Sequence, residues 1–131
     1  MAFYQKQFRS QSVTLSLEQL EEKLRETLQC DFQTSVVHSS PHMEVRLLVF
    51  EQYFYRASGT ISLSVLLTQT NETQTIDLIS SGGGEGLSYT FGACRSFVEE
   101  FAAHLESYGF HDPDPEPNKS IVSKLFHYFV D

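Results

Sequence analysis

The feature that most constrains the fold is a series of strand-like segments separated by short polar gaps. Residues 44–56 are rich in β-branched and aromatic side chains, and residues 60–69 alternate apolar and polar side chains as a half-buried strand does. Residues 75–80 form a further segment of this kind, and residues 34–38 form a weaker one. The gaps are too short for the helical crossovers that join parallel strands. The pattern therefore predicts an antiparallel meander.

A strongly amphipathic helix is predicted ahead of the meander. Ser16 is a suitable N-cap, and Gln19 three residues later completes a capping box. The mixed segment 3–9 before this helix is expected to be an edge strand. The leucines that follow the cap recur at helical spacing and form one apolar stripe, Leu17, Leu20, Leu24 and Leu28.

A second helix is predicted after the meander. Residues 87–91 alternate as a further short strand does, and Ser96 with Glu99 then matches a capping box, so the helix is expected to begin at Ser96. It should end at Gly109, with Phe110 packed against the last turn as in a Schellman motif. Its predicted apolar face consists of Phe97, Phe101, Leu105 and Tyr108.

Together these segments predict an α+β fold, in which two amphipathic helices pack on one face of an antiparallel β-meander sheet, in the order β-α-β-β-β-β-α. Residues 1–110 are expected to form one domain. In residues 111–131, alternate prolines predict an extended linker, and Asn118 is expected to cap a short C-terminal helix. Such a helix is too short to be stable alone, so we expect it to dock. Its predicted interface residues are Ile121, Val122, Leu125, Phe126 and Phe129.

Composition excludes several classes of function. The net charge is −8, and the 9 Lys and Arg residues form no cluster, so nucleic acid and anionic membranes are not expected partners. No segment approaches the roughly 18 consecutive apolar residues of a membrane span, and the N-terminus lacks a signal-peptide pattern. Two cysteines are too few for a disulfide scaffold. We expect a reduced cytoplasmic protein.

The stretch "SSGGGEG", residues 80–86, holds four of the seven glycines of the chain. Consecutive glycine amides can bind an anion, but neither the dinucleotide nor the P-loop fingerprint is complete here. The second helix is expected to begin ten residues after Gly86, too far away to direct its dipole at the loop. A structural turn and a ligand-contacting loop both stay open. The candidate ligand-binding residues of this stretch are Ser81, Gly82, Gly83, Gly84, Glu85 and Gly86.

The segments "TIDLISSGGGEGLSYTFGA" and "FVEEFAAHLESYGF" carry a resemblance. Over residues 75–110 the chain resembles an uncharacterised family of small bacterial proteins, in which a strand, an SSGGGxG loop and a closing amphipathic helix follow one another. The resemblance implies a bacterial origin. It implies no activity and no catalytic residues, and the segment from residue 111 onward is additional to the family pattern.

The cysteines and histidines indicate neither a metal site nor a cofactor. His38 and His42 have an H-x3-H spacing, but Pro41 lies between them, and no cysteine or carboxylate ligand is near in sequence. Cys94 precedes the expected helix start, where a helix dipole would stabilise a thiolate. No nucleophile signature surrounds it. We therefore interpret Cys94 as a small buried thiol and predict no catalytic residue.

Three functions remain open. The strand 44–56 has apolar side chains on both faces, so its second face needs a cover, and the C-terminal helix, a partner subunit or an apolar ligand would each supply one. The first hypothesis is a non-enzymatic binding or protein-interaction module, with the C-terminal helix docked on its own sheet or on a second copy in a homodimer. A third and weaker hypothesis is an enzyme using Cys94 or a histidine near the glycine run.

The second hypothesis is a carrier of a small apolar ligand. A sheet closed by a helix can leave a cavity, as in helix-grip lipid and hormone binders, although this is an analogy of fold alone. The glycine run would then lie at the mouth of the cavity. The expected wall residues are Phe50, Phe54, Tyr89 and Phe101.

Overall fold

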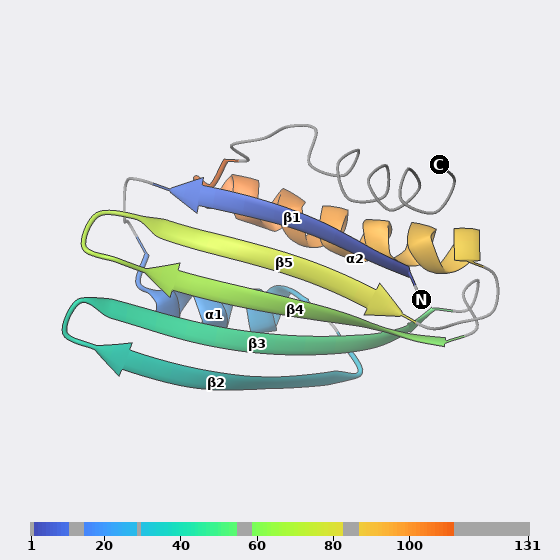
Figure 1. Ribbon diagram of the computed structural model, residues 1–131, viewed down its shortest axis with the longest axis horizontal. Helices are drawn as coiled ribbons and strands as arrows, with labels where there is room; N and C mark the ends of the chain where they lie inside the picture. Colours follow the sequence, from blue (N-terminus) through green and yellow to red (C-terminus); the bar gives the residue numbers. More distant parts are fainter. Residues whose placement is uncertain (1, 11–14, 29, 55–58, 83–86, 112–131) are drawn as a thin grey trace, which may run out of the picture.

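The computed structural model describes residues 2–10, 15–28, 30–54, 59–82 and 87–111. This part of the chain contains two helices and one five-stranded sheet (Figure 1). In chain order the elements are β1 (Ala2–Ser10), α1 (Leu17–Thr27), β2 (Phe32–Ser40), β3 (Met43–Phe54), β4 (Gly59–Gln69), β5 (Gln74–Gly82) and α2 (Leu87–Ser107). The predicted α+β class and the order β-α-β-β-β-β-α are confirmed.

All strand pairs of the sheet are antiparallel, and the spatial order is β1-β5-β4-β3-β2. Strands β2 to β5 form the predicted meander, with short turns between β2 and β3 and between β4 and β5. β1 pairs with β5, so it lies at one edge of the sheet while β2 lies at the other. The predicted edge strand at 3–9 is confirmed. Because α1 joins β1 to β2, it carries the chain from one edge to the opposite edge.

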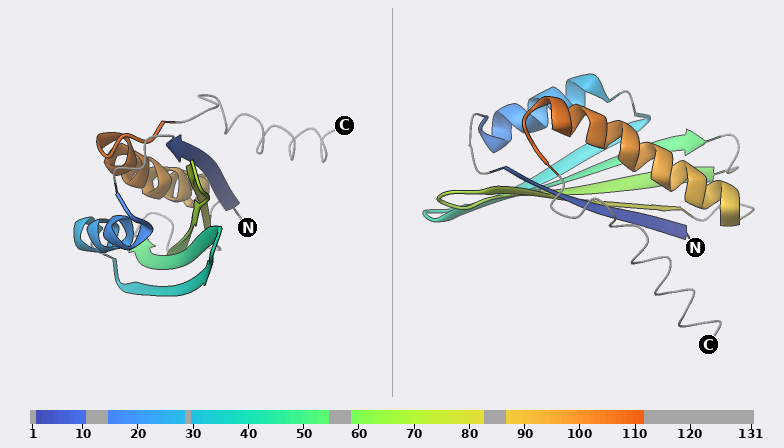
Figure 2. Two further views of the ribbon diagram at one scale, coloured as in Figure 1. Left: turned by 90° about the vertical axis from the view of Figure 1, so that its left-hand side faces the viewer. Right: turned by 90° about the horizontal axis from the view of Figure 1, so that it is seen from above.

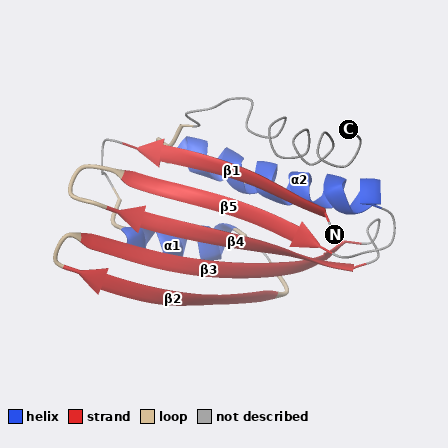
Figure 3. Ribbon diagram, in the orientation of Figure 1, coloured by secondary structure: helices blue, strands red, loops and turns tan. Residues whose placement is uncertain are grey.

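Both helices cover the same face of the sheet, as predicted (Figure 2, right; Figure 3). We call this the inner face and the opposite one the outer face. The inner side chains of the strands and the apolar stripes of the helices form one core. In β4, alternate side chains are fully buried on the inner face: Ile61, Leu63, Val65 and Leu67. Each Å² of apolar surface that is removed from water contributes about 25 cal/mol to the free energy of unfolding, so this core is the main source of stability.

Helix α1 forms as its sequence predicts. The Ser16 side chain accepts a hydrogen bond from the Gln19 amide at 3.1 Å, and the Gln19 side chain accepts one from the Ser16 amide at 3.0 Å. The capping box is therefore complete. The four leucines of the stripe, Leu17, Leu20, Leu24 and Leu28, are all buried.

Helix α2 corrects the prediction. It begins at Leu87, so residues 87–91 are its first turns and no strand, and Ser96 lies inside it instead of capping it. The helical register explains the difference, because the buried side chains recur at intervals of three and four residues from the first turn onward. They are Thr90, Ala93, Cys94, Phe97, Val98, Phe101, Ala102 and Leu105. The alternation in 87–91 and the capping-box match at Ser96 and Glu99 suggested a later helix start than the structure shows.

The end of α2 is the predicted Schellman motif. The Phe110 amide donates to the Leu105 carbonyl at 3.2 Å, and the Gly109 amide donates to the Glu106 carbonyl at 3.2 Å. Gly109 has φ = 94°, a conformation that favours glycine. Phe110 is buried. The predicted linker and C-terminal helix from residue 112 onward lie outside the described residues.

Candidate functional site

The glycine run begins inside the sheet. Ser80, Ser81 and Gly82 are the last residues of β5, and residues 83–86 lie outside the described part of the chain. α2 begins directly after the run, at Leu87, and not ten residues later. The prediction that no helix begins near this loop is therefore wrong. A ligand role for residues 83–86 stays a prediction.

Gly82 is required for close packing. A Cβ atom at this position would lie 2.3 Å from Ile61 Cδ1 and 3.3 Å from Thr90 Cγ2. Ile61 belongs to β4 and Thr90 to α2, so the missing side chain lets the first turns of the helix approach the sheet. On the outer face, the hydroxyls of Ser62 and Ser81 form a hydrogen bond at 3.0 Å. The first glycine of the run is thus a packing residue.

The aromatic side chains expected to line a cavity do not lie together. The Phe50 and Phe101 rings are buried in the core with their centroids 6.0 Å apart, and Phe54 packs against Phe97 with centroids 5.8 Å apart. Tyr89, in contrast, is 60% exposed on α2. The structure therefore brings Phe50 and Phe101 into contact but leaves Tyr89 at the surface. An apolar ligand between sheet and helices stays an untested prediction.

Cys94 lies in the interior of α2 and is fully buried. Burial raises the pKa of its thiol, and this effect outweighs the hydrogen bond of Ser80, which lowers it. The thiol is therefore neutral at neutral pH. The prediction that Cys94 precedes the helix is wrong, so the proposed dipole stabilisation of a thiolate does not apply. Burial also raises the pKa of Cys30, and the charges of Glu100 and Asp31 act in the same direction.

The histidines are dispersed. His38 and His42 are exposed at the β2–β3 turn region, and His104 is half-buried on α2. No group of three or more His, Cys, Asp or Glu residues suited to a metal ion occurs in the described ranges. His127 lies outside them.

Most of the exposed large apolar side chains of the described residues lie on the outer face of the sheet. The register places Val36, Leu47 and Leu66 side by side in one row across β2, β3 and β4. Their exposed fractions run from 36% for Leu66 to 51% for Val36. With the neighbours in the adjacent rows they form what we call the outer patch: Val36, Val45, Leu47, Val49, Leu66 and Ile79.

The outer patch has a polar border on the β5 and β1 side. The row of Leu66 continues into Asp77 of β5 and Gln7 of β1. The Gln7 side-chain amide donates to the Asp77 carboxylate at 2.8 Å. The apolar side chains of the outer face are therefore concentrated on β3, with Val36, Leu66 and Ile79 beside them, and Asp77 and Gln7 border them. Apolar surface with a polar border is typical of protein interaction sites.

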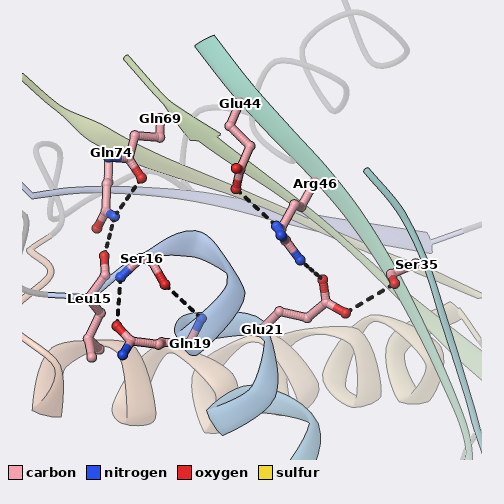
Figure 4. A network of polar contacts seen from close by, with 9 residues as sticks. All are labelled: Leu15, Ser16, Gln19, Glu21, Ser35, Glu44, Arg46, Gln69 and Gln74. Carbon is pink, nitrogen blue, oxygen red and sulfur yellow. Dashed lines mark hydrogen bonds and ion pairs between the residues drawn. The ribbon is translucent and has the colours of Figure 1, made fainter. Parts of the chain in front are cut away.

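A polar network on the inner face fastens α1 to β2 and β3 (Figure 4). Arg46 of β3 binds Glu21 of α1 and Glu44 of its own strand, each at 3.0 Å. Ser35 of β2 donates to Glu21 at 3.1 Å and accepts from Arg25 at 2.8 Å. Burial alone would lower the pKa of Arg46, but the hydrogen bonds and charges of the two glutamates outweigh it and raise the pKa. This arrangement is a structural clamp with balanced charge.

Sequence reasoning missed this network. Glu21 and Arg46 come from different elements, so neither residue alone signals the contact. One signal was present: Arg46 lies on the same face of the strand as Leu48 and Phe50, which are both buried. A cation in such a position needs a buried partner.

Comparison with known proteins places the chain in a family without assigning an activity. In the described part of the chain, neither helix has the length and apolar character needed to cross a membrane. No curated protein and no solved structure matches the chain. Residues 1–109 match the family described as "Family of unknown function (DUF6054)". The match agrees with the resemblance to an uncharacterised family, and the chain belongs to the family of unknown function DUF6054.

Proposed function

We propose that this protein is a non-enzymatic interaction module whose contact surface is the outer patch. The observation that carries the proposal is the uneven covering of the sheet: both helices lie on the inner face, and the apolar row of the outer face is left to solvent among the described residues. Isolated exposed apolar residues need no explanation, but a contiguous row across three strands with a polar border does.

The segment that we assign to this patch is residues 118–131, either of the same chain or of a second copy of the chain. Its apolar residues Ile121, Leu125 and Phe129 recur every fourth position, and Val122 and Phe126 extend the same stripe. A helix of this composition needs an apolar surface to be stable. The outer patch is the described surface that offers one.

The path of the chain supports this assignment. His111 pairs with Arg9 of β1 through two backbone hydrogen bonds of 2.9 and 3.0 Å, so the chain reaches residue 111 at the β1 edge. Leu66 on β4 and Leu47 on β3 lie two and three strands away from β1, which is about 10–15 Å at the usual strand spacing. Residues 112–117, with proline at alternate positions, span about 19 Å in an extended polyproline conformation. The linker is therefore long enough.

A photo-crosslinking experiment on the full chain tests the proposal. A benzophenone amino acid replaces Leu66, and the matched control places it at Ser96, an exposed position on the opposite side of the molecule. After irradiation and tryptic digestion, we expect the Leu66 probe to join peptides that follow Lys119 or Lys124, and the Ser96 probe to give none. The gel mobility of the product tells whether the contact lies within one chain or between two.

Two variants of the segment sharpen the test. Phe126→Asp changes the apolar stripe and should abolish the crosslink at Leu66, while Ser123→Asp adds the same charge off the stripe and should preserve it. Equal crosslinking in both variants, or a Leu66 probe that never joins residues 118–131, would contradict the proposal.

A further inference from the structure

The β2 edge of the sheet has a property that the outer patch does not explain. The strand order ends at β2, and within the described residues this strand pairs with β3 alone. Its nine residues, "FQTSVVHSS", contain no Lys, Arg, Asp, Glu or Pro. Val36 is 51% exposed and Val37 is 45% exposed. A long, uncharged edge strand of this kind is a template for pairing with another strand.

The β1 edge, unlike the β2 edge, is protected against pairing with another strand. β1 carries Lys6 and Arg9, and the backbone of Arg9 is paired with His111 beyond the edge. Charged side chains and a covering segment are the usual means by which proteins prevent edge-to-edge association. The same sheet therefore has one edge with these devices and one edge without them.

The charges beside β2 permit the approach of a second copy. The net charge of −8 would oppose association if it were concentrated there. Next to β2, however, the two carboxylates of Glu21 and Glu44 are paired with the guanidinium groups of Arg25 and Arg46. These four charges balance one another, and the carboxylates of Asp31 and Glu51 lie at the Phe32 end of the strand, away from its middle.

We propose that β2 pairs antiparallel with β2 of a second copy of this chain around a twofold axis, which joins the two sheets into one. Full overlap of residues 32–40 places Val36 opposite Val36 of the second copy and Thr34 opposite His38, so no like charges of Lys, Arg, Asp or Glu meet. Nine paired residues form about eight to ten backbone hydrogen bonds. The row of Val36, Leu47 and Leu66 then continues across the axis into its counterpart.

The pairing closes at two chains. A twofold interface uses the β2 edge of both copies and leaves only the protected β1 edges outside, so the sheet does not grow into a fibre. A single strand edge is small for a protein interface, so the dimer should dissociate on dilution.

Mass measurement of the full chain over a concentration series tests this inference. Light scattering coupled to size exclusion should show the wild-type protein shifting from monomer to dimer as concentration rises. Val37→Lys places a charge on the edge beside the axis and should remain monomeric, while Val37→Thr keeps a β-branched side chain and should dimerise like the wild type. A wild-type protein that is monomeric throughout, or a dimer that Val37→Lys leaves unchanged, overturns the inference.

Disulfide trapping supplies an independent readout of the register. Cysteine at position 36 faces its own copy across the axis and should form an intermolecular disulfide under mild oxidation, whereas Tyr89→Cys, exposed on α2, should not. If both variants form disulfides equally, the pairing is wrong. Neither variant alters residues 118–131, so failure of the edge pairing leaves the crosslinking test of the outer patch intact, and the converse also holds.

Discussion

The two faces of β4 show how one alternating strand serves two purposes. Its inner side chains Ile61, Leu63, Val65 and Leu67 are all 0% exposed beneath the helices. Leu66 lies between Val65 and Leu67 in sequence, but its side chain is on the outer face and is 36% exposed. The inner residues are explained by the core, because the domain needs them to bury apolar surface. Folding of the domain does not explain Leu66, which is why we assign the outer patch to binding.

The largest expected effect comes from truncating neighbouring leucines on the two faces. Leu67→Ala leaves a cavity in the core and should lower the free energy of unfolding by about 2–5 kcal/mol. Leu66→Ala, one residue away, should cost less than about 1 kcal/mol, because its side chain is already partly in water. Urea denaturation followed by circular dichroism measures both values.

The same two variants test whether the two faces of β4 differ in their contribution to stability. Should Leu66→Ala destabilise the full chain as much as Leu67→Ala, the outer patch would be part of the folding core and not a binding surface. Unchanged stability in Leu67→Ala would mean that the helices do not pack on β4 as described.

The next effect in size concerns the clamp between α1 and the inner face. Arg46→Met removes the guanidinium group that Glu21 and Glu44 share, although Glu21 keeps its ion pair with Arg25, and the side chains of the Arg46–Glu21 pair are only 14% and 13% exposed. We expect a loss of about 1–3 kcal/mol, between the values for exposed and for buried ion pairs. The measurement is the same urea titration.

A double variant tests the cause of that loss. In Glu21→Leu/Arg46→Met, both partners of the Arg46–Glu21 ion pair become apolar, so the combined loss should be smaller than the sum of the single losses. Simple additivity would show that Arg46 and Glu21 do not stabilise each other.

Much of this fold follows from local sequence signals, and the failures have a common physical origin. The capping box at Ser16, the alternation in β4 and the glycine at the end of α2 are all local, and the structure confirms each of them. The start of α2 was misplaced because the alternation in 87–91 locally favours a strand and Ser96 with Glu99 matches a capping box, whereas packing on the sheet decides the helix.

The candidate site depends on relations that a single sequence does not display. The row of Val36, Leu47 and Leu66 exists only once the register of three strands is known. The apolar side chains on both faces of residues 44–56 did indicate an uncovered face of this strand. They did not show which side chains of the neighbouring strands lie beside them on that face. Likewise, the contrast between the β1 and β2 edges requires the strand order, which the sequence alone leaves open.

A smaller, pH-dependent effect is expected from the buried thiol under the inner face. The pKa of Cys94 is raised in the folded protein, so the unfolded chain loses this proton at lower pH than the folded one does. The contribution of the neutral Cys94 thiol to the free energy of unfolding is fully present below the ordinary pKa of 9.0. It is lost as the pH rises through the higher pKa of the folded protein. Stability should therefore fall above pH 9.0 by a larger amount in the wild type than in Cys94→Ala.

The measurement for the thiol is the urea midpoint at a series of pH values, with alkylation as a control. Iodoacetamide at pH 8 should leave Cys94 unmodified in the folded protein and modify it in urea. Rapid alkylation without denaturant would contradict the burial of this residue beneath the sheet.

The smallest effect concerns the solvent side of α2, opposite its contact with the inner face. Gly92 lies inside the helix, its surroundings are open, and a Cβ atom there would meet nothing within 4 Å. Gly92→Ala should therefore raise the free energy of unfolding by about 0.5–1 kcal/mol, since alanine loses less backbone entropy on helix formation. Gly109→Ala is the matched control: its φ of 94° is unfavourable for alanine, so this variant should be destabilised. If residues 87–91 were a strand and the helix began only at Ser96, as the local pattern suggested, Gly92 would lie outside the helix and Gly92→Ala would not raise the free energy of unfolding. The sign of this one small effect thus distinguishes a helix that begins at Leu87 from one that begins at Ser96.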